Sequence, residues 1–116
     1  GVQTCALPIL YMDWYTVEYL YPLSFSKFKE MMFPYTGIVS LTVLENYDLK
    51  KLYSFFDKLG VYLIVEKMKS NQWLYTITTN DIVLGPGNFH SSREETENEG
   101  FSDCFKLLEK ILNRPN

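Results

Sequence analysis

The chain has 116 residues, of which 47% are hydrophobic and 22% are charged, as is typical of a single ordinary globular domain. Its net charge of −3 argues against a general binder of polyanions, which needs a basic face. Two cysteines are too few for a disulfide scaffold, so a reducing compartment is expected, and no apolar run approaches the roughly 20 residues of a membrane span.

Residues 1–9 (GVQTCALPI) follow neither a helical nor a strand period. They resemble the translated sequencing-adapter tails found at the ends of metagenomic assemblies. The resemblance implies that Met12 is the natural start. From its length and the elements predicted below, the remainder, residues 12–116, is expected to form a single α+β domain. Residues 1–11 would then be a non-native or disordered tail, and they are left out of the fold prediction.

Three elements are predicted between residues 14 and 43. Residues 14–21 alternate and are rich in aromatic and β-branched side chains, which favours a strand that ends at Pro22. A short helix follows, capped by Ser24 and stopped by Pro34. Its apolar face consists of Phe25, Phe28, Met31 and Met32. Residues 34–37 predict a turn, and residues 38–43 predict a short strand with blurred alternation.

The next segment predicts a helix followed by antiparallel strands. Residues 46–59 form the helix, with Asn46 as its N-cap and Gly60 at the left-handed C-terminal cap. Its buried stripe consists of Leu49, Leu52, Tyr53, Phe56 and Leu59. Residues 61–68 and 72–79 predict a hairpin. Residues 82–84 predict a short third strand, which the sequence Gly-Pro-Gly ends.

The last predicted helix, residues 92–113, organises the fold. Ser92 and Glu95 predict a capping box at its start. Its apolar stripe, which Thr96 and Gly100 extend as small residues, consists of Phe101, Cys104, Phe105, Leu108, Ile111 and Leu112. Because glycine costs about 1 kcal/mol inside a helix, we expect the backbone at Gly100 to lie close against a sheet.

Together these elements predict an α+β fold with two layers. A mainly antiparallel sheet of three to five strands carries helices on one face, because each amphipathic helix must bury its stripe. The long C-terminal helix covers the hairpin, so Phe101, Phe105 and Leu108 are expected to pack on the strands. Glu97 is expected at the surface, where its replacement by alanine would change stability by only a few tenths of a kcal/mol.

The sequence predicts no catalytic residue, no cofactor and no metal site, and the chain is not expected to be an enzyme. Cys104 and His90 form the one conceivable thiol–imidazole pair, but Cys104 lies on the apolar stripe and is expected to be buried. Glu95 and Glu99 have the spacing with which two carboxylates share a divalent metal, with Asp103 as a third acid. Solvated acids that suit the helix dipole are the simpler interpretation.

The hairpin supplies a candidate interaction surface. Strand alternation puts Trp73, Tyr75 and Ile77 on one face, and Tyr62 and Ile64 are candidates for the same face. If helices cover only one side of the sheet, this row faces water, and exposed aromatic residues mark interfaces. Tyr62, Trp73 and Tyr75 are therefore the predicted surface. The alternative is that they form the tyrosine-rich edge of the core.

The order helix–strand–strand–strand–helix from Asn46 onward is similar to that of the double-stranded-RNA-binding domain. That family opens its last helix with a lysine cluster that contacts phosphates across the groove. Here residues 93–97 read Arg-Glu-Glu-Thr-Glu, and these acids would repel phosphates. The resemblance therefore implies the topology without the RNA binding.

The C-terminal part of the chain also resembles small uncharacterised α+β proteins of tailed phages and of gut or marine bacteria. The residues that carry this resemblance are 52–62 (LYSFFDKLGVY), Trp73, 92–95 (SREE), 100–101 (GF) and 105–109 (FKLLE). It implies no known activity and no functional residue.

The function expected from these observations is that of a non-enzymatic accessory or protein-interaction module from a phage or bacterium. It would act in the cytoplasm of the bacterium or infected cell, with an unknown protein partner and without nucleic acid, membrane or cofactor. One alternative is nucleic-acid binding through the lysines at 27, 29, 50, 51, 67 and 69, if folding gathers them on one side. A second is a small metal-dependent hydrolase or nuclease that uses the acidic helix start.

Overall fold

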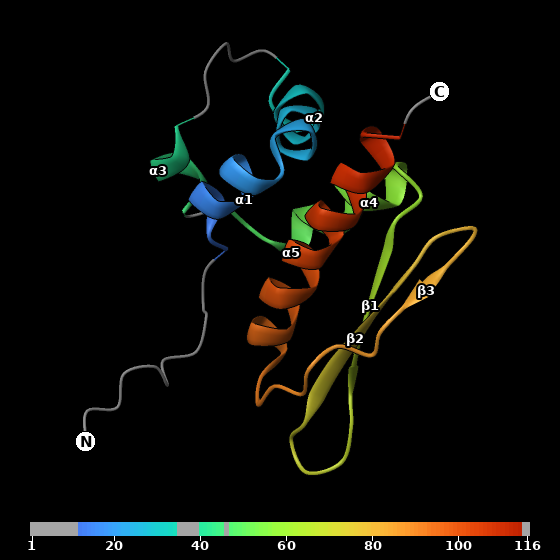
Figure 1. The fold of residues 1–116 in the computed structure, drawn as a ribbon. Helices are drawn as coiled ribbons and strands as arrows, with labels where there is room; N and C mark the ends of the chain where they lie inside the picture. The colour runs from blue at the N-terminus through green and yellow to red at the C-terminus, as the bar shows by residue number, and fades with distance from the viewer. Residues whose placement is uncertain (1–11, 35–39, 46, 115–116) are drawn as a thin grey trace, which may run out of the picture.

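A computed structural model describes residues 12–34, 40–45 and 47–114. Within these ranges the helices are α1 (Trp14–Leu20), α2 (Pro22–Met32), α3 (Leu41–Leu44), α4 (Lys50–Lys58) and α5 (Arg93–Leu112). The strands are β1 (Tyr62–Lys67), β2 (Trp73–Thr78) and β3 (Val83–Leu84) (Figure 1). The predicted α+β fold with an antiparallel sheet and a long C-terminal helix is confirmed. The predicted tail, the turn after Pro34 and the cap Asn46 lie outside the described residues.

The sheet is antiparallel with the strand order β1-β2-β3. Leu63 of β1 lies opposite Ile77 of β2, which in turn lies opposite Leu84 of β3. In the β1–β2 turn, Ser70 and Asn71 have φ angles of 61° and 59°. A type I′ turn requires positive φ at both central residues and matches the twist of the strands it joins. The predicted hairpin and third strand are thus confirmed.

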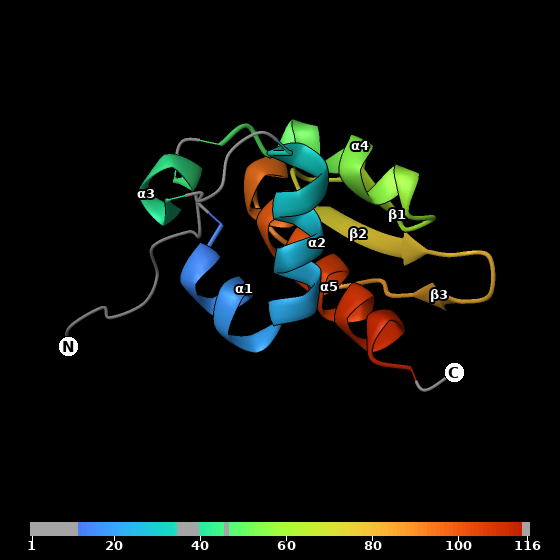
Figure 2. The same ribbon diagram turned by 90° about the horizontal axis from the view of Figure 1, so that it is seen from above.

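Helix α5 lies between the sheet and the N-terminal helices (Figures 1 and 2). Helices α4 and α5 pack on one face of the sheet, and α1 and α2 pack on α5. Half of the 20 residues of α5 are buried, more than one apolar stripe requires. On the sheet side, a β-carbon added at Gly100 would come within 2.7 Å of Leu63 Cδ1 and 3.3 Å of Tyr75 Cγ. The expected close approach of Gly100 to a sheet is confirmed.

Gly100→Ala is therefore expected to lower the free energy of unfolding by up to about 2 kcal/mol. Overpacking costs about 1–3 kcal/mol, and the better helix propensity of alanine returns only about 1 kcal/mol. Urea denaturation measures the difference, with the exposed Lys106→Ala on the same helix as control. A stabilised Gly100→Ala protein would mean that the Leu63 side chain moves aside freely.

The other side of α5 faces helices rather than the hairpin. The ring of Phe105 contacts rings from α1, α2 and α4, namely Trp14, Phe28, Phe55 and Phe56. The ring of Phe101 packs against Tyr53 and Phe56 of α4. The expectation that Phe105 packs on the strands is therefore corrected, because the sheet side of α5 is taken by smaller residues such as Gly100.

Two segments predicted as strands are helical. Residues 14–21 were expected to be a strand, but they contain α1, whose buried residues Trp14 and Val17 are three positions apart. The carboxylate of Asp13 accepts from the amide and the hydroxyl of Thr16, which caps the helix and lowers the pKa of Asp13. Tertiary burial of Trp14 thus overrides the strand propensity of the segment. Residues 41–43, predicted within a strand, belong to α3.

The two predicted helices of the middle of the chain are present with shifted starts. Helix α2 begins at Pro22, where the fixed φ of proline suits the first helical position. Ser24 does not cap it: its hydroxyl donates to the carbonyl oxygen of Phe105 over 2.8 Å. Helix α4 begins at Lys50 and is followed by Gly60 with φ 76°, the left-handed conformation predicted there.

Candidate functional site

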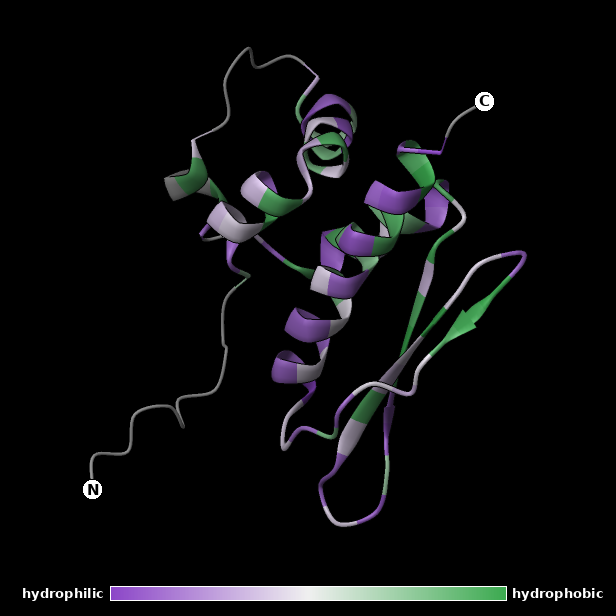
Figure 3. Cartoon of the chain, viewed as in Figure 1, coloured by the Kyte–Doolittle hydropathy of each residue, from purple (hydrophilic) through white to green (hydrophobic). Residues whose placement is uncertain are grey.

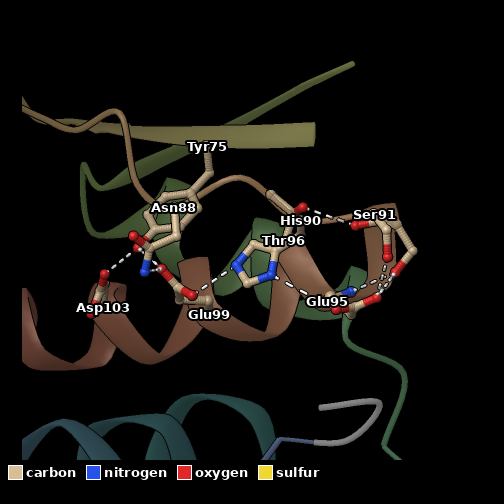
Figure 4. Close-up of polar contacts among 9 residues, drawn as sticks. Tyr75, Asn88, His90, Ser91, Glu95, Thr96, Glu99 and Asp103 are labelled. Atoms are coloured by element: carbon tan, nitrogen blue, oxygen red, sulfur yellow. Dashed lines mark hydrogen bonds and ion pairs between the residues drawn. The ribbon is translucent and has the colours of Figure 1, made fainter. Parts of the chain in front are cut away.

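A polar network joins the loop before α5 to the first three turns of that helix (Figure 4). His90 is fixed to β2, because its amide and carbonyl both pair with Trp73. Its Nε2 lies 2.7 Å from Glu99 Oε2, and its Nδ1 lies 3.8 Å from Glu95 Oε2. The contact with Glu99 is within hydrogen-bonding distance, and its direction depends on the tautomer of the imidazole. Asn88 donates to the other Glu99 oxygen over 3.2 Å.

The same network continues to the sheet through Tyr75. This side chain is 3% exposed, and its hydroxyl contacts Asp103 and lies 3.1 Å from Glu99 Oε1. Burial and the hydrogen bond to Asp103 raise the pKa of Tyr75 well above its ordinary value. The phenol therefore stays protonated and acts as a donor that ties β2 to α5.

The serine half of the predicted capping box is present at the start of α5, whereas Glu95 contacts hydroxyl groups there. Ser92 Oγ accepts from the amide of Glu95 over 3.2 Å. The Glu95 carboxylate accepts from the hydroxyls of Ser91 and Ser92, each over 3.0 Å. Glu95 thus stabilises the loop that precedes the helix.

The contacts of Glu95 and Glu99 differ from the solvated acids that the sequence favoured, since both carboxylates are engaged within the network. The imidazole of His90 stands between Glu95 and Glu99, the pair considered for a divalent metal. In the described parts of the chain, no group of three or more His, Cys, Asp or Glu residues is arranged to hold a metal ion. Cys104 is fully buried, and burial raises the pKa of its thiol well above the ordinary value, so the reactive thiolate is disfavoured. The contacts of the network link the loop, α5 and the sheet.

Glu97 is not the surface residue that the sequence predicted. It is 5% exposed, because it lies on the side of α5 that faces α4. It accepts a hydrogen bond of 2.7 Å from the hydroxyl of Tyr53, and Arg93 Nε lies 3.6 Å from the same carboxylate oxygen. The acidic start of α5 is thus a mixture of exposed and structural carboxylates.

Glu97→Ala is accordingly expected to lower the free energy of unfolding by about 1–2 kcal/mol. The substitution removes a charge-assisted hydrogen bond and leaves the half-buried Tyr53 hydroxyl without its acceptor. The control is Glu94→Ala, since Glu94 is exposed on the same turn and should change stability by about 0.5 kcal/mol or less. Equal effects of the two substitutions in thermal or urea denaturation would contradict this role of Glu97.

The structure separates the residues of the predicted interaction surface. Residues opposite each other in an antiparallel pair lie on one face. Trp73 and Tyr75 lie on the face that α5 covers, where Tyr75 meets Gly100. Tyr62 lies opposite Thr78 and is on the other face. The sequence grouped the residues correctly within each strand, but it wrongly placed the aromatic residues of the two strands on the same face of the sheet.

The face of the sheet opposite the helices carries exposed apolar side chains. One row crosses all three strands, from Tyr62 through Thr78 to Val83, and Ile64 with Thr76 forms the next row. Tyr62, Ile64 and Val83 are 42%, 44% and 68% exposed. We call these five residues the outer sheet face. Figure 3 shows β3 coloured as hydrophobic at the edge of the sheet away from the helices. Val83 was missed in the sequence, although the apolar run at 82–84 signals it.

Comparisons of the chain with protein-family models, with curated proteins and with solved structures found no match. Among the described residues, none of the helices has the length and apolar character needed to cross a membrane. The order α4-β1-β2-β3-α5 is the one on which the similarity to double-stranded-RNA-binding domains was based, with Glu94 and Glu95 in the first turn of α5.

Proposed function

We propose that the domain is a non-enzymatic protein-interaction module that binds a partner protein through the outer sheet face. The observation that supports this proposal is the row Tyr62–Thr78–Val83, which leaves two large apolar side chains exposed on a regular, three-stranded surface. Contiguous exposed apolar surface is characteristic of interaction sites. Tyrosine in particular supplies contact area together with a hydroxyl for hydrogen bonding.

The composition of the outer sheet face suits a protein partner. Its threonines lie between the apolar residues and present methyl groups and hydroxyls on a flat, β-branched surface. Burial of the exposed parts of Tyr62, Ile64 and Val83 would contribute roughly 25 cal/mol per Å² of apolar surface. Thr78 lies on the central strand, between Tyr62 of β1 and Val83 of β3. The surface is therefore preorganised and loses little conformational entropy on binding.

The lysines considered for nucleic-acid binding belong to separate elements. Lys27 and Lys29 are on α2, while Lys67 ends β1 and Lys69 follows it in the hairpin turn. Figure 1 places α2 and this turn at opposite ends of the molecule. A binder of phosphates needs its cations along one face, so this distribution favours the protein-interaction proposal. We further propose, from the resemblance to phage and bacterial proteins, that the module acts in the cytoplasm.

The test compares the proteins that co-purify with the wild-type chain and with two variants in cells of the source organism. Val83→Lys places a charge at the β3 end of the apolar row, and Tyr19→Lys is the matched control on α1, where Tyr19 is 83% exposed. We expect a protein retained by the wild type and by Tyr19→Lys but lost with Val83→Lys. Retention that is equal for all three chains would overturn the assignment of the outer sheet face.

A further inference from the structure

We propose that two copies of this chain associate through the open edge of β1, which joins their sheets into one continuous antiparallel sheet. This goes beyond the proposed function, because it concerns the edge of the sheet rather than its outer face and names a second copy as the partner. Neither proposal depends on the other.

The hydrogen-bond pattern shows which backbone groups of β1 face the open edge. Bonding residues alternate along an antiparallel strand. The amide of Met68 donates to the carbonyl of Gln72, so the even-numbered residues of β1 bond to β2. On the side of β2 away from β1, Trp73 pairs with His90 and the carbonyl of Tyr75 accepts from Gly87. The odd-numbered residues of β2 thus bond away from β1, which leaves its even-numbered residues to bond to β1. The N–H and C=O groups of Leu63, Val65 and Lys67 therefore point away from β2.

Most of β1 lacks the features that normally prevent pairing, since its charged residues, Glu66 and Lys67, are confined to its C-terminal end. Among the described residues, β1 is hydrogen-bonded only to β2, and the strand order puts it at the border of the sheet. Its six residues, YLIVEK, contain no proline, no glycine and three consecutive aliphatic residues. Proteins usually protect such an edge with proline, bulges or very short strands. The opposite border has such protection, since β3 is two residues long and is followed by Gly85 and Pro86.

The sequence of β1 is complementary to itself in one register. With the two-fold axis at Ile64, the two Ile64 side chains lie next to each other, Leu63 faces Val65 of the second copy, and Tyr62 faces Glu66 of the second copy. Leu63 and Val65 are residues whose backbone groups point to the open edge, so this register also forms the hydrogen bonds. No like charges are opposed. Moving the axis to Val65 would put Ile64 opposite Glu66, which buries less apolar surface.

Self-association can be measured directly by sedimentation velocity of the wild-type chain at increasing concentration. We expect a monomer–dimer equilibrium in the micromolar range. Val65→Pro removes an N–H group that points to the open edge and leaves the hydrogen bonds between β1 and β2 in place. It is expected to weaken the dimer by about tenfold or more, with a far-ultraviolet circular dichroism spectrum like that of the wild type. A wild-type chain that remains monomeric throughout would overturn the proposal.

Disulfide trapping tests the register and remains informative if Val65→Pro fails to fold. In a Cys5→Ser background, Ile64→Cys places two thiols next to each other at the two-fold axis, where opposed residues outside the hydrogen-bonded pairs have Cα atoms roughly 4.5 Å apart. The matched control is Thr76→Cys, which lies beside Ile64 on the same face but on the central strand. We expect rapid oxidation to a covalent dimer for Ile64→Cys alone. Equal trapping of both variants, or of neither, would overturn the β1–β1 interface. This result would not depend on the outcome of the co-purification test of the outer sheet face.

Discussion

Phe105→Ala is expected to lower the free energy of unfolding by about 3–5 kcal/mol, the cost of losing a large buried ring together with the cavity that remains. The side chain is 0% exposed. Its ring centre lies 4.9 Å from that of Phe56 and 5.7 Å from that of Trp14. Since these two rings belong to α4 and α1, the substitution removes contacts with several helices at once. A domain with a total stability of about 5–15 kcal/mol would lose a large part of it.

The measurement is equilibrium denaturation in urea, with Leu112→Ala as the control. Leu112 lies on the same helix and was predicted on the same stripe, but it is 39% exposed. Its replacement should cost much less than that of Phe105, because little packing is lost at an exposed position. Similar losses for the two variants would contradict the position of Phe105 at the junction of the helices. A large loss for Phe105→Ala alone would support it.

Phe105 also shows what the sequence could predict and what it could not. The three- and four-residue spacing of apolar residues correctly identified α5 and the burial of Phe101, Cys104, Phe105 and Leu108. Such periodicity says which residues are buried but not which element buries them. Helix α5 is covered on two sides, by the sheet at Gly100 and by helices at Phe105, and the second side depends on contacts far away in the sequence.

Local signals identified several turns and caps correctly, although the predicted cap at Ser24 was wrong. The turn at Ser70 and Asn71, the left-handed conformation of Gly60 and the cap at Ser92 occur where the sequence indicated them, because these conformations depend on residues close in the chain. Residues 14–21 were assigned incorrectly for the opposite reason. Their strand propensity is outweighed by the burial of Trp14 against Phe28, a contact between neighbouring helices that alternation alone does not reveal.

The candidate site was predictable only in part. The sequence pointed to exposed aromatic residues on the hairpin, and Tyr62 does lie on the exposed face. It did not show that Trp73 and Tyr75 belong to the covered face, because that depends on the strand register and on the position of α5. The contacts of His90 with Glu95 and Glu99 were equally hidden, since the loop that carries His90 is fixed by its pairing with Trp73.

The start of α2 leads to the second large expected effect. This helix has no side-chain cap of its own, since its N-cap position is occupied by Tyr21. Instead, the Glu109 carboxylate of α5 accepts from the amide of Leu23 over 3.3 Å and from that of Ser24 over 2.8 Å. A negative charge at this position also compensates the positive end of the helix dipole. Glu109 is 9% exposed, so few water molecules can replace it.

Glu109→Ala is therefore expected to lower the free energy of unfolding by about 3 kcal/mol. The substitution leaves two amides of the first turn of α2 without acceptors, and hydrogen bonds to a charged group contribute about 1.5–3 kcal/mol each without being fully additive. The exposed neighbour Lys110→Ala serves as the control and should change stability by about 0.5 kcal/mol or less. Urea denaturation measures both variants.

Glu109→Gln separates the hydrogen bonds from the charge. The amide oxygen of glutamine can still accept from Ser24, so this variant is expected to lose only about 1 kcal/mol, part of which reflects the weaker interaction with the helix dipole. Hydrogen exchange of the Ser24 amide provides a local measurement: it should accelerate strongly in Glu109→Ala and moderately in Glu109→Gln. If both variants lost the same stability while exchange at Ser24 stayed slow, the cap would come from elsewhere. The side chain of Glu109 would then contribute through its charge alone. The bond from Ser24 Oγ to the carbonyl of Phe105 would still attach α2 to α5 in both variants.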